Sequence, residues 1–175
     1  KSEKEYAKES KIYLGKDSIV INNAVPNMPK KEFKGINKTY IKKKSSEINV
    51  ISLCRFVRQK NINDILKISK KIPNIQFSII GDGPLFKEIK NSIKKYNIKN
   101  VDLLGKKENV YKYLYTSDIF LSTSLYEGLP MSILEAMSIG LPIVATNVTG
   151  NCDTIVNGKS GFLYELNDIY KAADY

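Results

Sequence analysis

Two carboxylates, Glu127 and Glu135, flank a predicted helix start in the segment EGLPMSILEAMSIG. Pro130 suits the first helical position, and Gly140 suits the position just past the helix end. The free N–H groups and the positive dipole end of such a helix attract anions. Glu135 follows Pro130 by about 7.5 Å along the axis and tilts back toward the helix N-terminus. Two acids beside an anion site would repel a bare phosphate, but they could accept hydrogen bonds from ribose and sugar hydroxyls.

The same residues also fit a purely structural role. Ser132, Glu135 and Ser138 recur every three residues, as they would on the solvent-exposed face of an amphipathic helix. Apolar runs at residues 119–121 and 142–145 predict buried strands on either side of the helix. The segment is therefore expected to form a strand–loop–helix–strand unit, and its spacing leaves both interpretations of the acids open.

Two basic residues follow another predicted strand, residues 48–54. Arg55 offers a planar fork and Lys60 a point charge, and both suit a diphosphate. With 28 lysines and arginines in the chain, this spacing is a weak signal by itself. The turn Gly81-Asp82-Gly83-Pro84 is not a dinucleotide fingerprint, because Phe86 stands where the third glycine is required.

Strands and helices alternate along the rest of the chain, which predicts an α/β fold with a Rossmann-like, doubly wound parallel sheet. Ligands bind such sheets beyond the carboxyl ends of the strands. The expected strands are residues 48–54, 75–80, 101–104, 119–121, 142–145 and 161–164, and the expected helices are residues 61–72, 84–96, 109–115, 130–139, 153–156 and 167–175. Before them, a helix is expected at residues 2–14, a short strand at 18–21 and an exposed linker at 27–46.

Composition limits the function further. The formal net charge of +10 favours phosphorylated, nucleic-acid or anionic lipid partners, although lysines spread over every exposed face would give the same total. The chain has no histidine, the commonest acid–base residue. Two cysteines, Cys54 and Cys152, are too few for a disulfide framework or a metal site. We expect Cys54 to be an inert core thiol, and a reducing, cytoplasmic setting fits this cysteine content.

The spacing Glu127-x7-Glu135, with its Gly-Leu-Pro and Glu-Ala-Met context, resembles the signature of family-4 ("group 1") retaining glycosyltransferases. The resemblance covers nearly the whole chain, most firmly residues 50–164. It implies the C-terminal, donor-binding half of a GT-B fold. Two positions depart from the family pattern, since Ala24 and Asn61 stand where glycine is usual.

The resemblance also implies roles for individual residues. Arg55 and Lys60 would hold the donor diphosphate, and amides near Gly128, Leu129 and Pro130 would assist them without a metal. Glu127 would hold sugar hydroxyls and Glu135 the ribose. The catalytic set would be Glu127, Arg55 and Lys60, and the backbone at Gly105 and Lys106 would contact the nucleobase.

These implications define the expected organisation. Residues 1–46 would be the tail of an N-terminal domain and a linker, and residues 47–175 a nucleotide-sugar-binding domain truncated at its end. The whole enzyme would transfer a sugar, with a UDP-sugar favoured, in glycan biosynthesis. The absent half would carry the acceptor site, so this chain alone would not transfer. A lipid-linked acceptor or a peripheral position at the inner membrane face is compatible with this scheme, whereas nucleic acid is not expected as a partner.

Two other functions stay open from the residues alone. A non-catalytic basic module that binds nucleotide or nucleic acid would need aromatic side chains between basic ones on one face. Tyr111, Tyr113 and Tyr115 come nearest to that pattern. A sugar-nucleotide epimerase on the same fold would need acid–base residues that the chain does not show.

Overall fold

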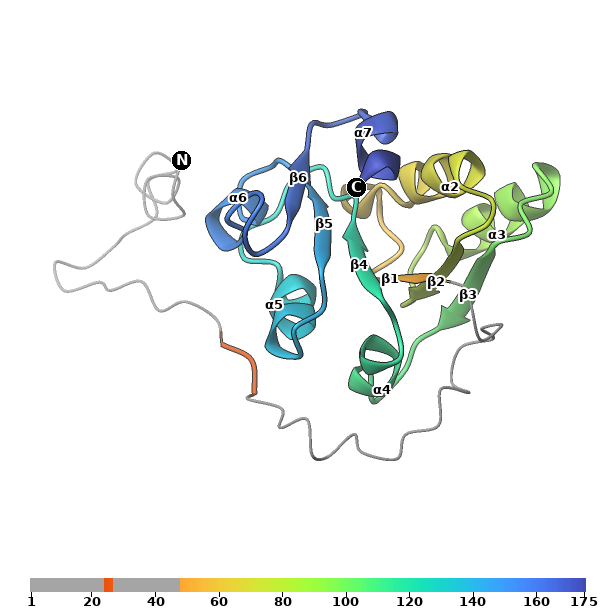
Figure 1. The fold of residues 1–175 in the computed structure, drawn as a ribbon. Helices are drawn as coiled ribbons and strands as arrows, with labels where there is room; N and C mark the ends of the chain where they lie inside the picture. Colours follow the sequence, from red (N-terminus) through yellow and green to blue (C-terminus); the bar gives the residue numbers. More distant parts are fainter. Residues whose placement is uncertain (1–23, 27–47) are drawn as a thin grey trace, which may run out of the picture.

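The computed structural model describes residues 24–26 and 48–175 (Figure 1). The helix expected at residues 2–14, the strand at 18–21 and the linker at 27–46 lie outside the described residues. Within them, six parallel strands form one sheet in the order β3-β2-β1-β4-β5-β6. This confirms the predicted α/β, Rossmann-like architecture. The strands are β1 Asn49–Leu53, β2 Gln76–Ile80, β3 Val101–Gly105, β4 Ile119–Ser122, β5 Ile143–Thr146 and β6 Phe162–Tyr164.

The helices cover both faces of this sheet (Figure 1). Alternate strand residues point to opposite faces, so Val50 packs under α2, α3 and α7 while Ile51 packs under α4 and α5. Burial on both faces explains why the strands read as continuous apolar runs. The helical elements are η3 Arg58–Lys60, α2 Ile62–Lys71, α3 Phe86–Lys95, α4 Tyr111–Tyr115, α5 Met131–Ser138, α6 Asn151–Thr154 and α7 Ile169–Asp174.

The strand order reverses between β1 and β4, the two central strands. They pair in parallel at Val50 with Ile119 and at Ile51 with Phe120, although nearly 70 residues separate them in sequence. The loops that follow them therefore start side by side at the same edge of the sheet and then diverge. A crevice at such a switch point is where doubly wound sheets bind ligands.

Most helix boundaries differ from the expectations by one or two residues, and the shifts at α5 and α6 have clear physical reasons. Pro130 is the extended N-cap of α5, with ψ of 96°, so the helix starts one residue later than predicted. Helix α6 starts at Asn151 rather than at residue 153 and ends before Ile155, which is extended and almost fully buried in the core. Burial of that β-branched side chain against the sheet fixes the chain there and outweighs the local helical pattern.

Candidate functional site

A groove of about 820 Å³ lies at the carboxyl ends of β1 to β4. It collects residues from the loops after these strands and from the first turns of α5. Seven of the residues singled out from the sequence line it, which places them in one site. They are Arg55, Lys60, Lys106, Glu127, Leu129, Pro130 and Glu135.

One wall of the groove is the contact between the loops after β1 and β2. The Phe56 N–H donates to the Asp82 carbonyl at 2.9 Å, and the Leu85 N–H donates to the Phe56 carbonyl at 3.0 Å. Gly81 and Gly83 pass so close to this backbone that a Cβ on either would clash with it. The Gly-x-Gly turn thus works through close backbone approach, which only glycine permits.

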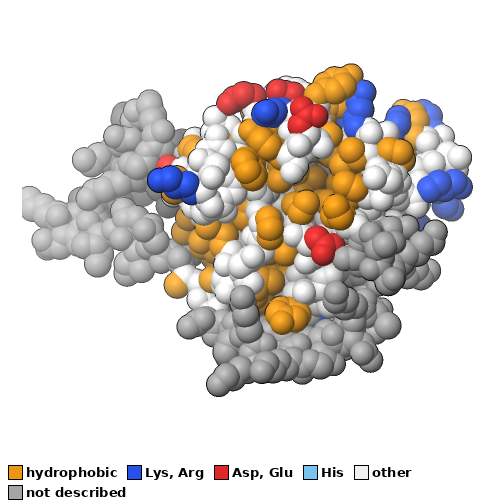
Figure 2. Space-filling model, in the orientation of Figure 1, with side chains coloured by type: hydrophobic (Ala, Val, Ile, Leu, Met, Phe, Trp, Pro, Cys, Tyr) orange, Lys and Arg blue, Asp and Glu red, His pale blue; other side chains and the backbone are white. Residues whose placement is uncertain are grey.

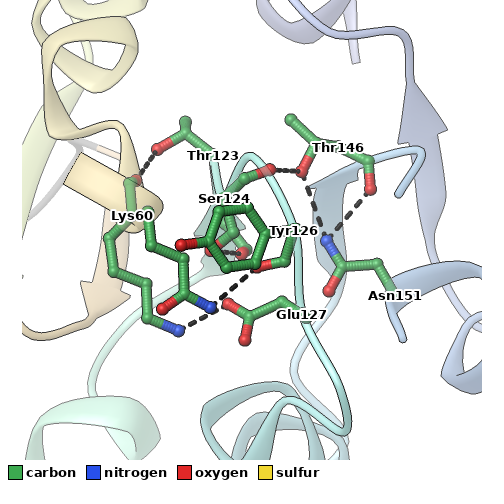
Figure 3. Close-up of polar contacts among 9 residues, drawn as sticks. Lys60, Thr123, Ser124, Tyr126, Glu127, Thr146 and Asn151 are labelled. Carbon is green, nitrogen blue, oxygen red and sulfur yellow. Dashed lines mark hydrogen bonds and ion pairs between the residues drawn. The ribbon is translucent and has the colours of Figure 1, made fainter. Parts of the chain in front are cut away.

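The ion pair between Lys60 and Glu127 crosses the switch point. The Lys60 Nζ lies 2.5 Å from the Glu127 Oε1, and the two side chains are 18% and 7% exposed. Figure 3 shows the pair at the end of the β4–α5 loop. The functional groups expected to hold phosphate and sugar are thus in contact with each other.

Backbone contacts hold the two loops that carry this pair. The Leu125 N–H donates to the Gln59 carbonyl, and the Gln59 Nε2 donates to the Tyr126 carbonyl, both at 2.8 Å. The Thr123 hydroxyl donates to the Lys60 carbonyl at 2.9 Å (Figure 3). The hydrogen bonds between the two loops therefore help to position Lys60 and Glu127, in addition to the attraction between their charges.

A second set of contacts supports the β4–α5 loop from the β5 side. The Thr146 hydroxyl donates to the Ser124 carbonyl at 2.6 Å, and the Asn151 Nδ2 donates to the Thr146 carbonyl at 3.0 Å (Figure 3). Gly150 packs against Gly128, whose carbonyl oxygen would lie 2.2 Å from a Cβ at position 150. The loop before Glu127 is thus fixed on both flanks.

Helix α5 presents its N-terminus and Glu135 to the groove. Its N-cap residue, Pro130, makes no side-chain capping bond, and the leading N–H groups of a helix attract anions. Burial raises the pKa of the Glu135 carboxyl above its ordinary value of 4.5. Burial, and secondarily the nearby Glu135, raise the pKa of the Tyr111 hydroxyl. Glu135 is thus half-buried and lies close enough to α4 to act on the Tyr111 hydroxyl.

Two of the predicted site residues do not line the groove but support it. Gly105 ends β3 with φ of 69°, and its carbonyl accepts the Gly81 N–H at 3.0 Å. Gly128 packs on Gly150 as described above. Arg55 is exposed and has no ion-pair partner among the residues that the structure describes. Its guanidinium is free to take a ligand.

Sequence reasoning missed several residues of the groove. Lys107 neighbours the predicted Lys106, and Ser132 lies one turn before Glu135, so local spacing could have found both. Val110 and Met131 also line the groove. Nothing in the sequence marks Gln59, because its contacts join loops 67 residues apart.

Cys54 lies at the end of β1 and contributes to the groove lining. Burial raises the pKa of this thiol to about 12, and the opposing effects of Lys60 and Glu127 are smaller. The thiol is therefore neutral near pH 7, as an inert cysteine should be. Among the described residues, no three His, Cys, Asp or Glu side chains cluster as metal ligands would.

The basic side chains do not form a single patch on the face shown in Figure 2. Lysines and arginines there are separated by hydrophobic and uncharged atoms. The basic side chains on this face are thus dispersed, as the composition allowed. None of the described helices has the length and apolar character needed to cross a bilayer.

Comparison with known proteins identifies a family. The family described as "Glycosyl transferases group 1" matches residues 34–175. An Escherichia coli UDP-Gal:alpha-D-GlcNAc-diphosphoundecaprenol alpha-1,3-galactosyltransferase is 44% identical over 100 residues, which are 56% of this chain and 26% of that protein. The Bacillus anthracis N-acetyl-alpha-D-glucosaminyl L-malate synthase is 32% identical over 83% of this chain and 39% of its own. The chain thus spans between a quarter and two fifths of these relatives.

Solved structures share the fold. A mutant of S. aureus TarM, in complex with fondaparinux, alpha-GlcNAc-glycerol and UDP, superposes with a TM-score of 0.79 and 27% identity. The match covers 99% of this chain and 34% of TarM. The lipopolysaccharide outer core galactosyltransferase WaaB gives a TM-score of 0.73 at 23% identity over 97% of this chain and 48% of its own. At that identity the likeness concerns the fold alone.

Proposed function

The chain belongs to the group 1 glycosyl transferases, and we propose that its groove binds the nucleotide diphosphate sugar from which the whole enzyme transfers a sugar. The observation that carries this proposal is the convergence of Arg55, Lys60, Glu127, Glu135 and the α5 N-terminus at the sheet's switch point. A UDP-sugar is the favoured donor, because the E. coli relative is named for UDP-Gal and the TarM complex contains UDP.

The proposed chemistry begins with the leaving group. As the glycosidic bond breaks, negative charge accumulates on the diphosphate. Arg55, Lys60 and the first amides of α5 supply positive potential without a metal. Glu127 accepts hydrogen bonds from sugar hydroxyls, and Glu135 accepts them from the ribose. Transfer proceeds with retention of the anomeric configuration, as in the family-4 enzymes that the sequence resembles.

The acceptor belongs to a part of the enzyme outside this chain. The chain spans 26% and 39% of two curated relatives, and the acceptor-side residues are assigned to the remainder. Closure of a second domain over the donor would exclude water and complete the site. This chain alone therefore binds donor without transferring it. A lipid-linked acceptor at the cytoplasmic face of a membrane fits this scheme, and residues 1–46 would link the two halves.

The alternative is a non-catalytic module that binds nucleotide or nucleic acid. Single-stranded nucleic acid prefers a basic groove with stacking aromatic side chains. Here Asp82, Glu127 and Glu135 line the groove together with four basic residues. Three carboxylates favour a ligand that brings hydroxyl groups as well as phosphates.

A thermal-shift screen tests the proposal. The chain is titrated with UDP, GDP and ADP, with UDP- and GDP-sugars, and with a single-stranded oligonucleotide. We expect saturable stabilisation by one nucleoside diphosphate and its sugar conjugate, since a ligand that binds only the folded state raises the melting temperature. Stabilisation by the oligonucleotide alone would favour the module, and no shift with any nucleotide would contradict the proposal.

A further inference from the structure

The ion pair between Lys60 and Glu127 joins two groups that the proposed function assigns to different parts of the donor. Lys60 is assigned to the diphosphate and Glu127 to the sugar. The Lys60 ammonium contacts the Glu127 carboxylate at 2.5 Å. Both side chains line the groove and are mostly shielded from water.

The surroundings make this contact a built feature of the site. Gln59, next to Lys60, binds the backbone at Leu125 and Tyr126, which directly precede Glu127. Thr123 fastens the start of the same loop to the Lys60 carbonyl. These hydrogen bonds place the backbone of Glu127 close to that of Lys60, so the ion pair does not depend on the side chains alone. The adjacent Cys54 thiol is neutral and cannot replace either charge.

A diphosphate that enters this groove finds the Lys60 ammonium already paired with the Glu127 carboxylate. To engage Lys60, it must displace the carboxylate or share the ammonium with it, and the second arrangement sets like charges side by side. Breaking the Lys60–Glu127 contact therefore makes the binding free energy of the diphosphate less favourable. A donor that also carries a sugar recovers part of this loss, because its hydroxyls can hydrogen-bond to the freed carboxylate.

We propose that Glu127 is an internal competitor of the diphosphate for Lys60. Donor binding exchanges the ion pair for two ligand contacts, Lys60 with phosphate and Glu127 with sugar. After the sugar has left, the nucleoside diphosphate no longer carries the sugar hydroxyls that bound Glu127, and its ribose hydroxyls are assigned to Glu135. The ion pair then re-forms and weakens the hold on the product. This inference rests on the proposed function. It gives Glu127 a role in product release, a step that limits the turnover rate of many enzymes.

The test measures binding of inorganic pyrophosphate and of UDP by isothermal titration calorimetry. Pyrophosphate lacks ribose and sugar, so it reports on the phosphate site alone. We expect Glu127→Gln to bind both ligands roughly three- to tenfold more tightly than the wild type, because Lys60 is then unpaired. Glu127→Ala serves as a second variant with the same expectation. Circular dichroism and melting curves verify that each variant folds.

Two matched variants make the result specific to the ion pair. Glu108→Gln removes the same charge from an exposed side chain that does not line the groove. We expect it to leave pyrophosphate affinity within twofold of the wild type, since only general screening changes. In a Lys60→Gln background, Glu127→Gln should give less than half of its gain, because most of that gain comes from freeing the lysine.

Four results would overturn the inference. They are unchanged or weaker binding in both Glu127 variants, an equal gain in Glu108→Gln, a gain that persists in full without Lys60, and a Glu127→Gln gain confined to UDP. Failure of the proposed function looks different. In that case neither UDP nor pyrophosphate binds the wild type saturably, whereas in the four results above the wild type still binds UDP.

Discussion

The Cα of Gly81 lies against the carbonyl group of Cys54, so that a Cβ added at Gly81 would lie 1.8 Å from the Cys54 oxygen. The close approach joins the turn after β2 to the end of β1. It explains why the wall of the groove needs glycine at a backbone φ of +140°. The wall and the loop that carries Arg55 are consequently one packed unit.

Gly81→Ala is expected to destabilise the chain by about 2–4 kcal/mol, because it combines backbone strain with overpacking against a carbonyl. Gly158→Ala is the matched control, since Gly158 also has positive φ but has open space around its Cα. That variant should lose only about 1–2 kcal/mol. Urea unfolding measures both values, and equal losses would mean that the Gly81–Cys54 contact does not decide stability.

Glu135 gives the chain a pH dependence of known sign. Burial raises the pKa of its carboxyl above 4.5 in the folded chain. At pH values between the unfolded and the folded pKa of Glu135, the folded state therefore binds more protons than the unfolded state. The contribution of Glu135 is fully present below the unfolded pKa and is lost as the pH rises through the folded pKa.

Glu135→Gln removes this dependence. The variant should be more stable than the wild type at pH 7 by less than about 1 kcal/mol, because the side chain is only half-buried. The difference should vanish below about pH 4, where the unfolded carboxyl also carries its proton. Melting curves from pH 3.5 to 7.5 follow it. A wild-type advantage at pH 7 would show that Glu135 is stabilised as a carboxylate.

Metal ions should not be needed for nucleotide binding. Arg55, Lys60 and the α5 N-terminus together offer the positive potential that a diphosphate requires. UDP or GDP should therefore raise the melting temperature equally with EDTA and with added magnesium. A shift that occurs only in the presence of magnesium would contradict this expectation.

The sequence was sufficient for those features that depend on local patterns. Apolar runs separated by helical segments predicted the parallel sheet, because strands covered on both faces contain few polar residues. The position of Glu135 in the groove also followed from local spacing, since helix geometry fixes its height above Pro130. Asn61 replaces a usual glycine, and the structure explains this: its φ of 46° is a left-handed conformation that asparagine tolerates.

The remaining features depend on contacts between distant segments. Lys60 and Glu127 are 67 residues apart, and no local pattern indicates that they pair. Gly105 and Gly128 hold the backbone of neighbouring loops, and their expected contacts with the donor stay predictions. Helix α6 was misplaced because burial of Ile155 is decided by the finished sheet and not by its neighbours in sequence.

The central claim is that Arg55 and Lys60 bind the diphosphate of a nucleotide. The most direct measurement compares UDP with uridine by isothermal titration calorimetry in the wild type, Arg55→Ala and Lys60→Ala. Each charge-assisted bond to a phosphate is worth about 1.5–3 kcal/mol, so each variant should bind UDP about ten- to a hundredfold more weakly. Uridine affinity should stay within twofold of the wild type, because the nucleoside carries no charge for these side chains. Equal losses for UDP and uridine, or no loss for either, would contradict the account.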